Sequence, residues 1–551
     1  MQTLFFLLFL YLFGQTIFPA ESRIPLDLFL RADPLIAIST ALSLRTVTVS
    51  LVLFALPVVV LTLLLGRVFC GWICPLGAVL DFSEKIFRWR RTRTKKDTPD
   101  RFPRLRRLKY YLLIGLLTTA VFAAGFRADT EMNLQTSLGL SLTYFFDPIA
   151  TITRSLVLGV IAPLQSLLII LHVDQALAHL AMTDFVLEHD TARSLLTGVQ
   201  KALAIRVDIP GARPHALLFY RFAPLALLIF AAIIALNSLA RRFWCRCICP
   251  LGALLGLLSR WAPVKNRVSE ACIDCGLCIR SCRTSAITED PRIYQVSECV
   301  ACHECISICP KGAISYAPAL KNLKAEPPLN LSRRRLLHAA GIGIGSVLLL
   351  KTDWGAKKTE SGNLKVSAAG LIRPPGALPE EEFVTACVRC GECMKVCPTN
   401  GLQPALGEGG LEAIGTPILV PRIGPCVHGC VSCWRVCPTA AIQPFTVEEK
   451  GWIGLGTAVI DHNTCIAWSQ DKICSICDEV CPYDAIHQER PELPMGTRPL
   501  LDENKCVGCG LCEKSCPTAP EAAIRVYSFG DTRHLSEEER KERFLANILA
   551  L

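Results

Sequence analysis

Long apolar stretches separated by charged segments dominate the first half of the chain. Residues 3–19, 47–66, 110–126 and 217–239 each approach the roughly 20 residues that a helix needs to cross a bilayer. A shorter, glycine-rich apolar run occupies 336–350. The pattern predicts an α-helical membrane bundle of about four spans plus one mid-chain span. The first stretch lacks a basic leader and a small-residue cleavage site, so we expect an uncleaved anchor.

The basic residues beside these stretches predict the topology. Twelve Lys and Arg fall between Lys85 and Lys109, and a second basic flank covers 241–267. Such clusters mark the cytoplasmic side, so an even number of crossings must separate them, and the third and fourth spans supply two. The apolar stretch Leu156–Val173 is therefore interpreted as part of one non-cytoplasmic loop, 128–215, that carries interfacial helices. Crossing of 156–173 and 193–207 as a pair would satisfy the same count.

The composition is typical of a membrane protein and argues against a nucleic-acid-binding protein or a disulfide-rich secreted protein. Hydrophobic residues make up 51% of the chain, and the mean hydropathy is +0.38. The net charge of +10 is concentrated in the basic flanks, so it does not indicate a nucleic-acid partner. The 29 cysteines recur at short, fixed spacings, whereas disulfide frameworks belong to small secreted chains. This cysteine pattern therefore indicates metal binding.

Six four-cysteine runs carry the chemistry, and most follow the bacterial ferredoxin spacing Cys-x2-Cys-x2-Cys-x3-Cys, usually ending in Cys-Pro. They predict six [4Fe–4S] clusters in two α+β ferredoxin-like domains. Zinc ribbons use two separated cysteine pairs instead, and the haem-like Cys299-x2-Cys302-His303 lies inside a complete run, so we expect neither zinc nor haem. The runs are Cys272, Cys275, Cys278 and Cys282; Cys299, Cys302, Cys305 and Cys309; Cys387, Cys390, Cys393 and Cys397; Cys426, Cys430, Cys433 and Cys437; Cys465, Cys474, Cys477 and Cys481; and Cys506, Cys509, Cys512 and Cys516.

In such runs three close cysteines bind one cluster and the fourth binds the partner cluster. Cys309 is therefore expected to bind the cluster of the first run, and Cys282 the cluster of the second. In the C-terminal region the third run could pair with the sixth and the fourth with the fifth, or neighbours could pair.

The predicted domains are a transmembrane domain at 1–264, a two-cluster ferredoxin at 265–318, a linker with an anchor at 319–382, a four-cluster ferredoxin at 383–528 and a helical tail at 529–551.

A separate motif, Cys-x3-Cys-Pro-Leu-Gly-Ala, occurs twice, each time just after a predicted span. It contains Cys70 and Cys74 in the first copy and Cys245 and Cys249 in the second. The four cysteines are interpreted as a redox or metal site, or as a surface where the membrane and ferredoxin parts exchange electrons. The alternative is that small buried thiols shape a helix-exit turn. Cys247 is interpreted as structural.

The segment Ser332-Arg-Arg-Arg-Leu-Leu337 before the mid-chain apolar run has a twin-arginine signal pattern. Because iron–sulfur clusters are assembled in the cytoplasm, such a signal would export the following domain already folded. An ordinary positive-inside anchor predicts the same topology. A third possibility is that 336–350 does not cross and that everything stays inside.

These features resemble two known families joined end to end. Residues 1–320 resemble NapH-type membrane quinol dehydrogenase subunits. Residues 330–528 resemble NapG and MauM ferredoxins, through the twin arginines, Leu-Ile-Arg-Pro-Pro-Gly-Ala at 371–377, Cys-Val-Arg-Cys-Gly-Glu-Cys at 387–393 and Gly-Thr-Pro at 415–417. The resemblance implies a multi-pass protein of the bacterial inner membrane that takes electrons from the quinone pool.

The resemblance and the predicted topology together imply that the first ferredoxin domain is cytoplasmic and the second periplasmic. A periplasmic cytochrome or terminal reductase would then accept the electrons. Two alternatives stay open. One is a membrane ferredoxin that acts in maturation or regulation of a partner metalloenzyme. The other is electron exchange between a cytoplasmic ferredoxin and quinone.

Overall fold

The computed structural model describes residues 1–20, 24–91, 105–123, 143–170, 220–287, 290–318, 331–350, 371–489 and 497–532. Several predictions lie outside the described residues: most of the basic loop, most of 128–215, much of the two linkers and the tail beyond 532. The chain divides into two compact units, which are described separately. Unit one comprises Met1–Phe13, Asp27–Ser155 and Leu225–Leu349, and unit two comprises Gly14–Leu26, Leu156–Pro224 and Leu350–Leu551.

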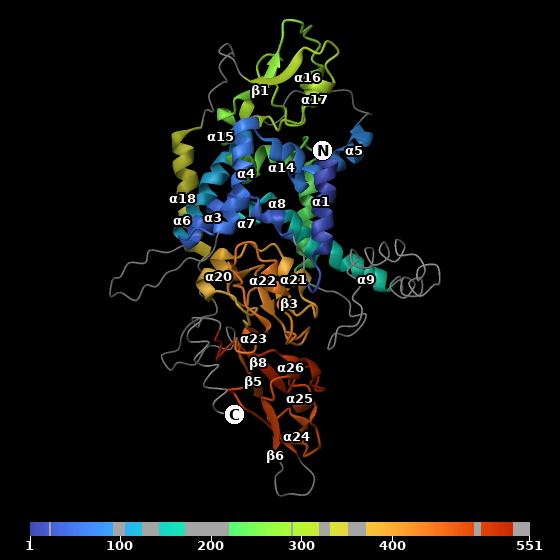
Figure 1. Ribbon diagram of the computed structural model, residues 1–551, viewed down its shortest axis with the longest axis vertical. Helices are drawn as coiled ribbons and strands as arrows, with labels where there is room; N and C mark the ends of the chain where they lie inside the picture. The colour runs from blue at the N-terminus through green and yellow to red at the C-terminus, as the bar shows by residue number, and fades with distance from the viewer. Residues whose placement is uncertain are drawn as a thin grey trace, which may run out of the picture. The chain divides into compact units, whose positions relative to one another are not determined.

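Unit one is built mainly from apolar helices, and α3, α4, α6 and α15 pack against one another (Figure 1). Proline placement sets two of the helix starts, since Asp33 and Asp147 each cap a helix that begins with proline, and the Asp33 carboxylate accepts from Leu35 N at 2.7 Å. The helices are α1 (Gln2–Gln15), α2 (Leu28–Arg31), α3 (Pro34–Leu44), α4 (Val49–Leu65), α5 (Pro75–Arg91), α6 (Leu108–Ala123), α7 (Thr143–Phe146), α8 (Pro148–Arg154), α13 (Ala223–Leu236), α14 (Phe243–Cys247), α15 (Pro250–Leu258) and α18 (Arg333–Leu350), with a π-helical turn at Phe69–Ile73.

The four predicted spans appear as the apolar helices α1, α4, α6 and α13, which have 14 to 17 residues each. Among the described residues, one helical stretch, Pro148–Gln165, is both long and apolar enough to cross a membrane. It runs through α8 into α9 (Ala162–Ile170) and overlaps the stretch that the sequence assigned to a loop. Because 72% of this stretch is buried inside the protein, it equally fits a core helix. The four-span bundle thus stays a prediction.

The two-cluster ferredoxin segment belongs to unit one. Strands β1 (Val264–Val268) and β2 (Ile314–Pro318) pair antiparallel, from Val264 opposite Pro318 to Val268 opposite Ile314, and so bring the ends of the segment together. Between them lie two one-turn helices, α16 (Leu277–Ser281) and α17 (Glu304–Ser307), which contact each other. This is the symmetric α+β arrangement expected of a two-cluster ferredoxin.

Unit two contains the four-cluster region as two sheet-and-helix groups. Its strands form two-stranded antiparallel sheets, β3 (Leu402–Pro404) with β4 (Pro417–Leu419), β5 (Thr457–Ile460) with β8 (Ile524–Tyr527), and β6 (Ile486–Glu489) with β7 (Arg498–Leu501). Helix α21 (Glu392–Val396) contacts α22 (Ser432–Arg435), and α25 (Ile476–Glu479) contacts α26 (Leu511–Ser515). The remaining described helices of the region are α20 (Glu380–Ala386), α23 (Val447–Lys450) and α24 (Ile466–Ser469).

Candidate iron–sulfur sites

Four of the six cysteine runs share one backbone conformation. The residues just before and just after the second cysteine are left-handed, as at Asp274 (φ 51°) and Gly276 (φ 69°) in the first run. The same two positions are left-handed at Ala301 and His303, at Arg389 and Gly391, and at Gly508 and Gly510. The loop curls at these points, and the one-turn helix that follows carries the third cysteine. The spacing is thus the signature of a loop wrapped around a small centre.

His303, the residue that makes the second run look like a haem-attachment motif, takes one of these left-handed positions. Its ring lies 5.5 Å from the ring of Trp72 and 4.7 Å from that of Tyr316. His428 similarly packs edge-on against Tyr483 at 5.1 Å. Both histidines therefore have packing roles.

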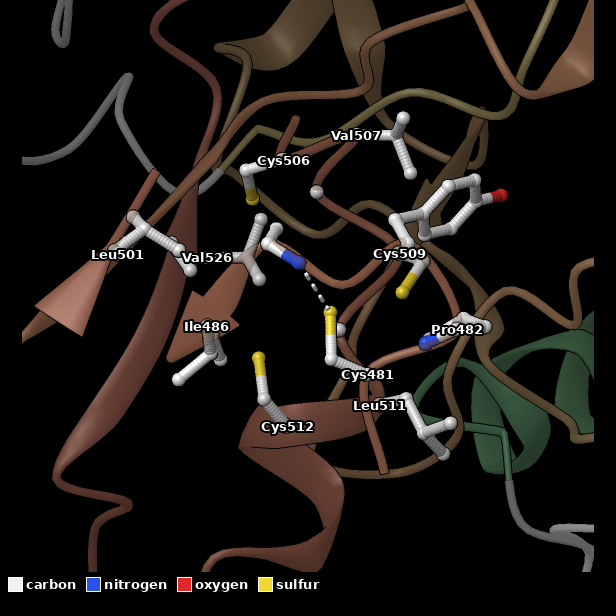
Figure 2. A pocket seen from close by; sticks show the side chains of 15 residues that line it. Cys481, Pro482, Ile486, Leu501, Cys506, Val507, Cys509, Leu511, Cys512 and Val526 are labelled. Carbon is white, nitrogen blue, oxygen red and sulfur yellow. Dashed lines mark hydrogen bonds between the residues drawn. The ribbon is translucent and has the colours of Figure 1, made fainter. Parts of the chain in front are cut away.

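In the C-terminal region each of three cavities is lined by four cysteines. Figure 2 shows one of them, in which the sulfur atoms of Cys481, Cys506, Cys509 and Cys512 point toward a common centre. The second is lined by Cys465, Cys474, Cys477 and Cys516, and the third by Cys387, Cys390, Cys393 and Cys437. In every case three cysteines come from one run and the fourth from its neighbour along the chain.

The remaining thiols complete a fourth set. Burial raises the pKa of Cys433, and the nearby Cys430, Cys426 and Cys397 raise it further, so these four lie together. Neighbouring runs therefore pair, the third with the fourth and the fifth with the sixth. The alternative pairing of the third run with the sixth does not occur.

Of the two crosswise partners that the spacing predicts in the N-terminal runs, Cys282 lies beside the cysteines of the second run. Burial, with Cys302, Cys282 and Cys278 nearby, raises the pKa of the Cys305 thiol to about 12. Cys309 packs against the buried hydrophobic cluster that contains both Cys278 of the first run and Cys305 of its own run, so its place with the first run stays a prediction. Cys282 thus joins the second run although arginine replaces the usual proline after it.

Backbone N–H groups point at the fourth cysteine of several runs. Ala286 N lies 3.2 Å from Cys282 Sγ, Ala313 N lies 3.3 Å from Cys309 Sγ, and Ala485 N lies 3.4 Å from Cys481 Sγ. The last of these contacts is the dashed line in Figure 2. N–H groups that donate to sulfur stabilise the thiolate and raise the reduction potential of a bound cluster.

The duplicated Cys-x3-Cys-Pro motif is longer than its cysteines suggest. Each copy begins with an arginine three residues before the first cysteine, Arg67 and Arg242. We call 67–78 and 242–253 the membrane repeats, after the membrane spans that the sequence predicts just before them. Both arginines are only 1% exposed. These arginines were not predicted as site residues, although both lie at the same distance in sequence from the first cysteine of their repeat.

The Cys299 loop, residues 299–305, lies directly on the first membrane repeat. A Cβ added to Gly71 would come within 2.1 Å of Val300 O, so only glycine allows this approach. Beside it, Arg67 Nη1 donates to Ser297 O at 2.7 Å. The buried Glu298 carboxylate accepts from Lys109 Nζ at 2.6 Å and from Tyr110 Oη at 3.1 Å. Lys109, the last residue of the first basic flank, thus supplies a buried positive charge at the contact.

Known family models match five segments of the chain. A 4Fe-4S binding domain matches residues 47–94 and 222–269, a 4Fe-4S dicluster domain matches 271–319 and 472–519, and a further 4Fe-4S binding domain matches 384–403. The chain therefore carries iron–sulfur domains in both units.

Curated relatives match the C-terminal ferredoxin-type region. A methylamine utilization ferredoxin-type protein MauM from Methylorubrum extorquens is 39% identical over 211 residues, which cover 36% of this chain and 90% of that protein. The chain belongs to the family of MauM and NapG ferredoxin-type proteins. MauM of Paracoccus denitrificans is 44% identical over 165 residues (29% of this chain, 71% of that protein), and NapG of Escherichia coli is 38% identical over 171 residues (29% and 71%). The resemblance of residues 1–320 to NapH-type subunits stays a prediction.

The thiol sets of this MauM/NapG-type ferredoxin fit cubane clusters. In a cubane each cysteine binds a different iron atom, so the ligands stand further apart than around a single ion. Among the described residues no group of three or more His, Cys, Asp or Glu is arranged for one metal ion. Four cysteines lining one cavity from two crossing runs are the donor set that a [4Fe–4S] cluster requires.

Proposed function

We propose that the protein is a membrane-bound iron–sulfur electron-transfer protein that oxidises quinol and relays single electrons through its clusters to a periplasmic acceptor, such as a cytochrome or a terminal reductase. The observation that carries the proposal is the contact of the Cys299 loop with the first membrane repeat. It brings a cluster-binding loop against the apolar helices, where a quinol dissolved in the bilayer would give up its electrons.

Outward-facing apolar side chains support a membrane position for these helices. On α4, Leu53, Leu56 and Leu64 are 66%, 53% and 52% exposed, and on α13 Leu228 is 66% exposed. Soluble proteins rarely expose contiguous apolar patches of this kind. Lipid chains would cover these side chains, and shorter helices are accommodated by local thinning of the bilayer.

The basic flanks support a cytoplasmic position for the first ferredoxin domain, and the twin-arginine pattern supports a periplasmic position for the second. In this scheme quinol loses two electrons and two protons, the electrons leave one at a time because each cubane carries one, and the last four clusters deliver them outside. The membrane repeats or the quinone itself connect the two groups of clusters.

A quinol-reduction experiment tests the proposal. Full-length protein, purified anaerobically in detergent, is mixed with menaquinol or ubiquinol, and cluster reduction is followed by visible bleaching and electron paramagnetic resonance. Reduction by either quinol is expected. Reduction by dithionite but by neither quinol would contradict the proposal and favour a maturation role.

A second candidate is electron exchange with a cytoplasmic ferredoxin, which the first cysteine run favours. Cys275 is exposed there, and its neighbours Ile273 and Leu277 are 57% and 36% exposed. A small apolar patch around a cluster ligand suits a transient redox partner. Reduction of the clusters by reduced ferredoxin, lost when Ile273 is replaced by Glu, would support this candidate.

A further inference from the structure

The two membrane repeats share the pattern Arg-x2-Cys-x3-Cys-Pro-Leu-Gly-Ala and bury their thiols almost completely. Cys70, Cys74, Cys245 and Cys249 are between 4% and 9% exposed. The two segments matched by the first 4Fe-4S binding domain model, 47–94 and 222–269, contain no cysteine besides these four and Cys247. Neither segment alone offers four ligands, whereas the two together do.

The repeats interlock through their arginines. A Cβ on Gly252 would lie 2.9 Å from Arg67 Nη2, and a Cβ on Gly77 would lie 3.6 Å from Arg242 Nη2. Each arginine therefore lies over the glycine of the other repeat. Arg242 Nη1 also donates to Cys70 O at 3.0 Å, and Arg67 Nη2 lies 3.9 Å from Cys70 Sγ. This reciprocal packing brings the two cysteine pairs to one place.

Each second cysteine stands at the start of a helix. Cys249 caps α15, and its Sγ accepts from Gly252 N at 3.2 Å. Gly77 N stands in the same relation to Cys74 at the start of α5. Backbone N–H groups at a helix start stabilise negative charge, so both sulfur positions are prepared for thiolates.

The charge balance around the repeats also calls for an anion. Glu298 is paired closely with Lys109 at 2.6 Å, whereas its distance to Arg67 is 3.9 Å. Asp81 pairs with Arg242 and, at 2.7 Å, with Arg283 Nη1, and Arg283 Nε also pairs with Glu304 at 2.6 Å. Arg67 Nε is buried and has no hydrogen-bond partner among the described residues. Because a buried charge is costly unless it is compensated, neutral thiols would leave an excess of buried cations here.

We propose that Cys70, Cys74, Cys245 and Cys249 ligate one additional cubane iron–sulfur cluster between the membrane repeats, with Arg67 and Arg242 compensating its negative charge. A cubane with four thiolates carries roughly two negative charges in its oxidised form, so it would offset the positive charge that Glu298 and Asp81 leave uncompensated among Arg67, Lys109 and Arg242. Arg67 and Arg242 are positioning residues in this assignment.

The position gives the cluster a role in the relay. Gly71, next to Cys70, packs on the Cys299 loop, and its Cβ would lie 3.7 Å from Cys302 N. The additional cluster accepts one electron and passes one electron to the site of Cys282 and the Cys299 loop, while quinol is oxidised in two such steps and releases two protons. This role rests on the proposed function, whereas the ligand assignment does not.

Metal analysis of the full-length protein tests the assignment without any variant. Iron, acid-labile sulfide, copper and zinc are measured per chain after anaerobic purification in detergent. We expect about four iron and four sulfide beyond the content of the six ferredoxin-type clusters. An iron content that the six clusters explain, or one zinc or copper ion per chain in place of the extra iron, would overturn the assignment.

Variants locate the additional iron. Cys70→Ala and Cys249→Ala are each expected to lose about four iron and four sulfide while the resonance signals of the ferredoxin-type clusters persist. Cys247→Ala is the matched control, because Cys247 is equally buried in the second repeat but has no counterpart in the first. Full iron content in Cys70→Ala, or equal loss in the control, would contradict the proposal. If a variant fails to fold, the wild-type count decides.

Discussion

Replacing Gly71 by alanine probes the contact between the first membrane repeat and the Cys299 loop. The added methyl group would lie 2.1 Å from Val300 O and 3.2 Å from Val300 C. Both neighbours are backbone atoms, so no side-chain rotation can relieve the clash. The loop must move away by roughly 1.3 Å to bring the 2.1 Å separation to an ordinary carbon–oxygen contact of about 3.4 Å.

Overpacking of this kind costs about 1–3 kcal/mol, and the upper part of that range applies because the obstacle is backbone. Since 1.4 kcal/mol is a factor of ten in an equilibrium constant, a cost of about 2–3 kcal/mol lowers the docked fraction relative to the undocked fraction by roughly 30- to 150-fold. The cysteines themselves are unchanged, so the variant should keep its clusters.

The assay compares two reductants on the same preparation. Dithionite should reduce the clusters of Gly71→Ala normally, whereas reduction by quinol should slow by at least about tenfold if the contact carries the electrons. Gly341→Ala on α18 is the control, since nothing lies within 4 Å of the added methyl group. Wild-type rates with quinol in Gly71→Ala, together with unchanged unfolding by urea, would refute the reasoning.

Three further predictions follow from the charges and the cluster pairing. Lys109→Met should lower the free energy of unfolding, measured by urea titration, by about 3–5 kcal/mol, because Glu298 loses its closest buried cation. Adding Glu298→Gln to this variant should restore much of the loss. An unchanged urea midpoint in Lys109→Met would contradict the prediction. Burial raises the pKa of Glu298, but the positive charges of Lys109 and Arg67 outweigh burial and hold this pKa below 4.5. The stability that the Glu298 carboxylate contributes is therefore present above pH 4.5 and should be lost as the pH falls further. A plot of stability against pH for Glu298→Gln should lack this decline. Cys481→Ser should perturb the same cluster resonance as Cys506→Ser and not that of Cys474→Ser, since Cys481 belongs to the cavity of the sixth run; grouping with Cys474→Ser would show that the pairing is wrong.

The gathering of the cysteines within each run could be predicted from sequence, because it depends on local geometry. Two-residue gaps, left-handed turns and a one-turn helix place three thiols without help from distant residues, and the family matches support the resulting iron–sulfur domains. The pairing of the C-terminal runs could not be predicted, because it depends on which helices pack together. Contacts of α21 with α22 and of α25 with α26 decide it.

The membrane repeats show what cysteine spacing misses. Arg67 and Arg242 were overlooked because an arginine beside an apolar stretch usually marks the cytoplasmic end of a membrane span. Here both side chains are buried instead. The role of Gly71 could not be foreseen either, since its constraint comes from Val300, far along the chain. The helix Pro148–Gln165 falls where interfacial helices were expected, but it begins before the apolar stretch 156–173 and is long enough to cross a membrane.

Electron delivery across the membrane tests the central claim most directly. Spheroplasts that contain the full-length chain are supplied with a substrate that reduces the quinone pool, and a membrane-impermeant acceptor is added outside. The account predicts reduction of this acceptor by the wild-type chain and little by Cys512→Ser, which removes a ligand of the cluster site shown in Figure 2. If the acceptor is reduced only in inverted vesicles, both ferredoxin regions face the cytoplasm and the proposed relay to the periplasm is wrong.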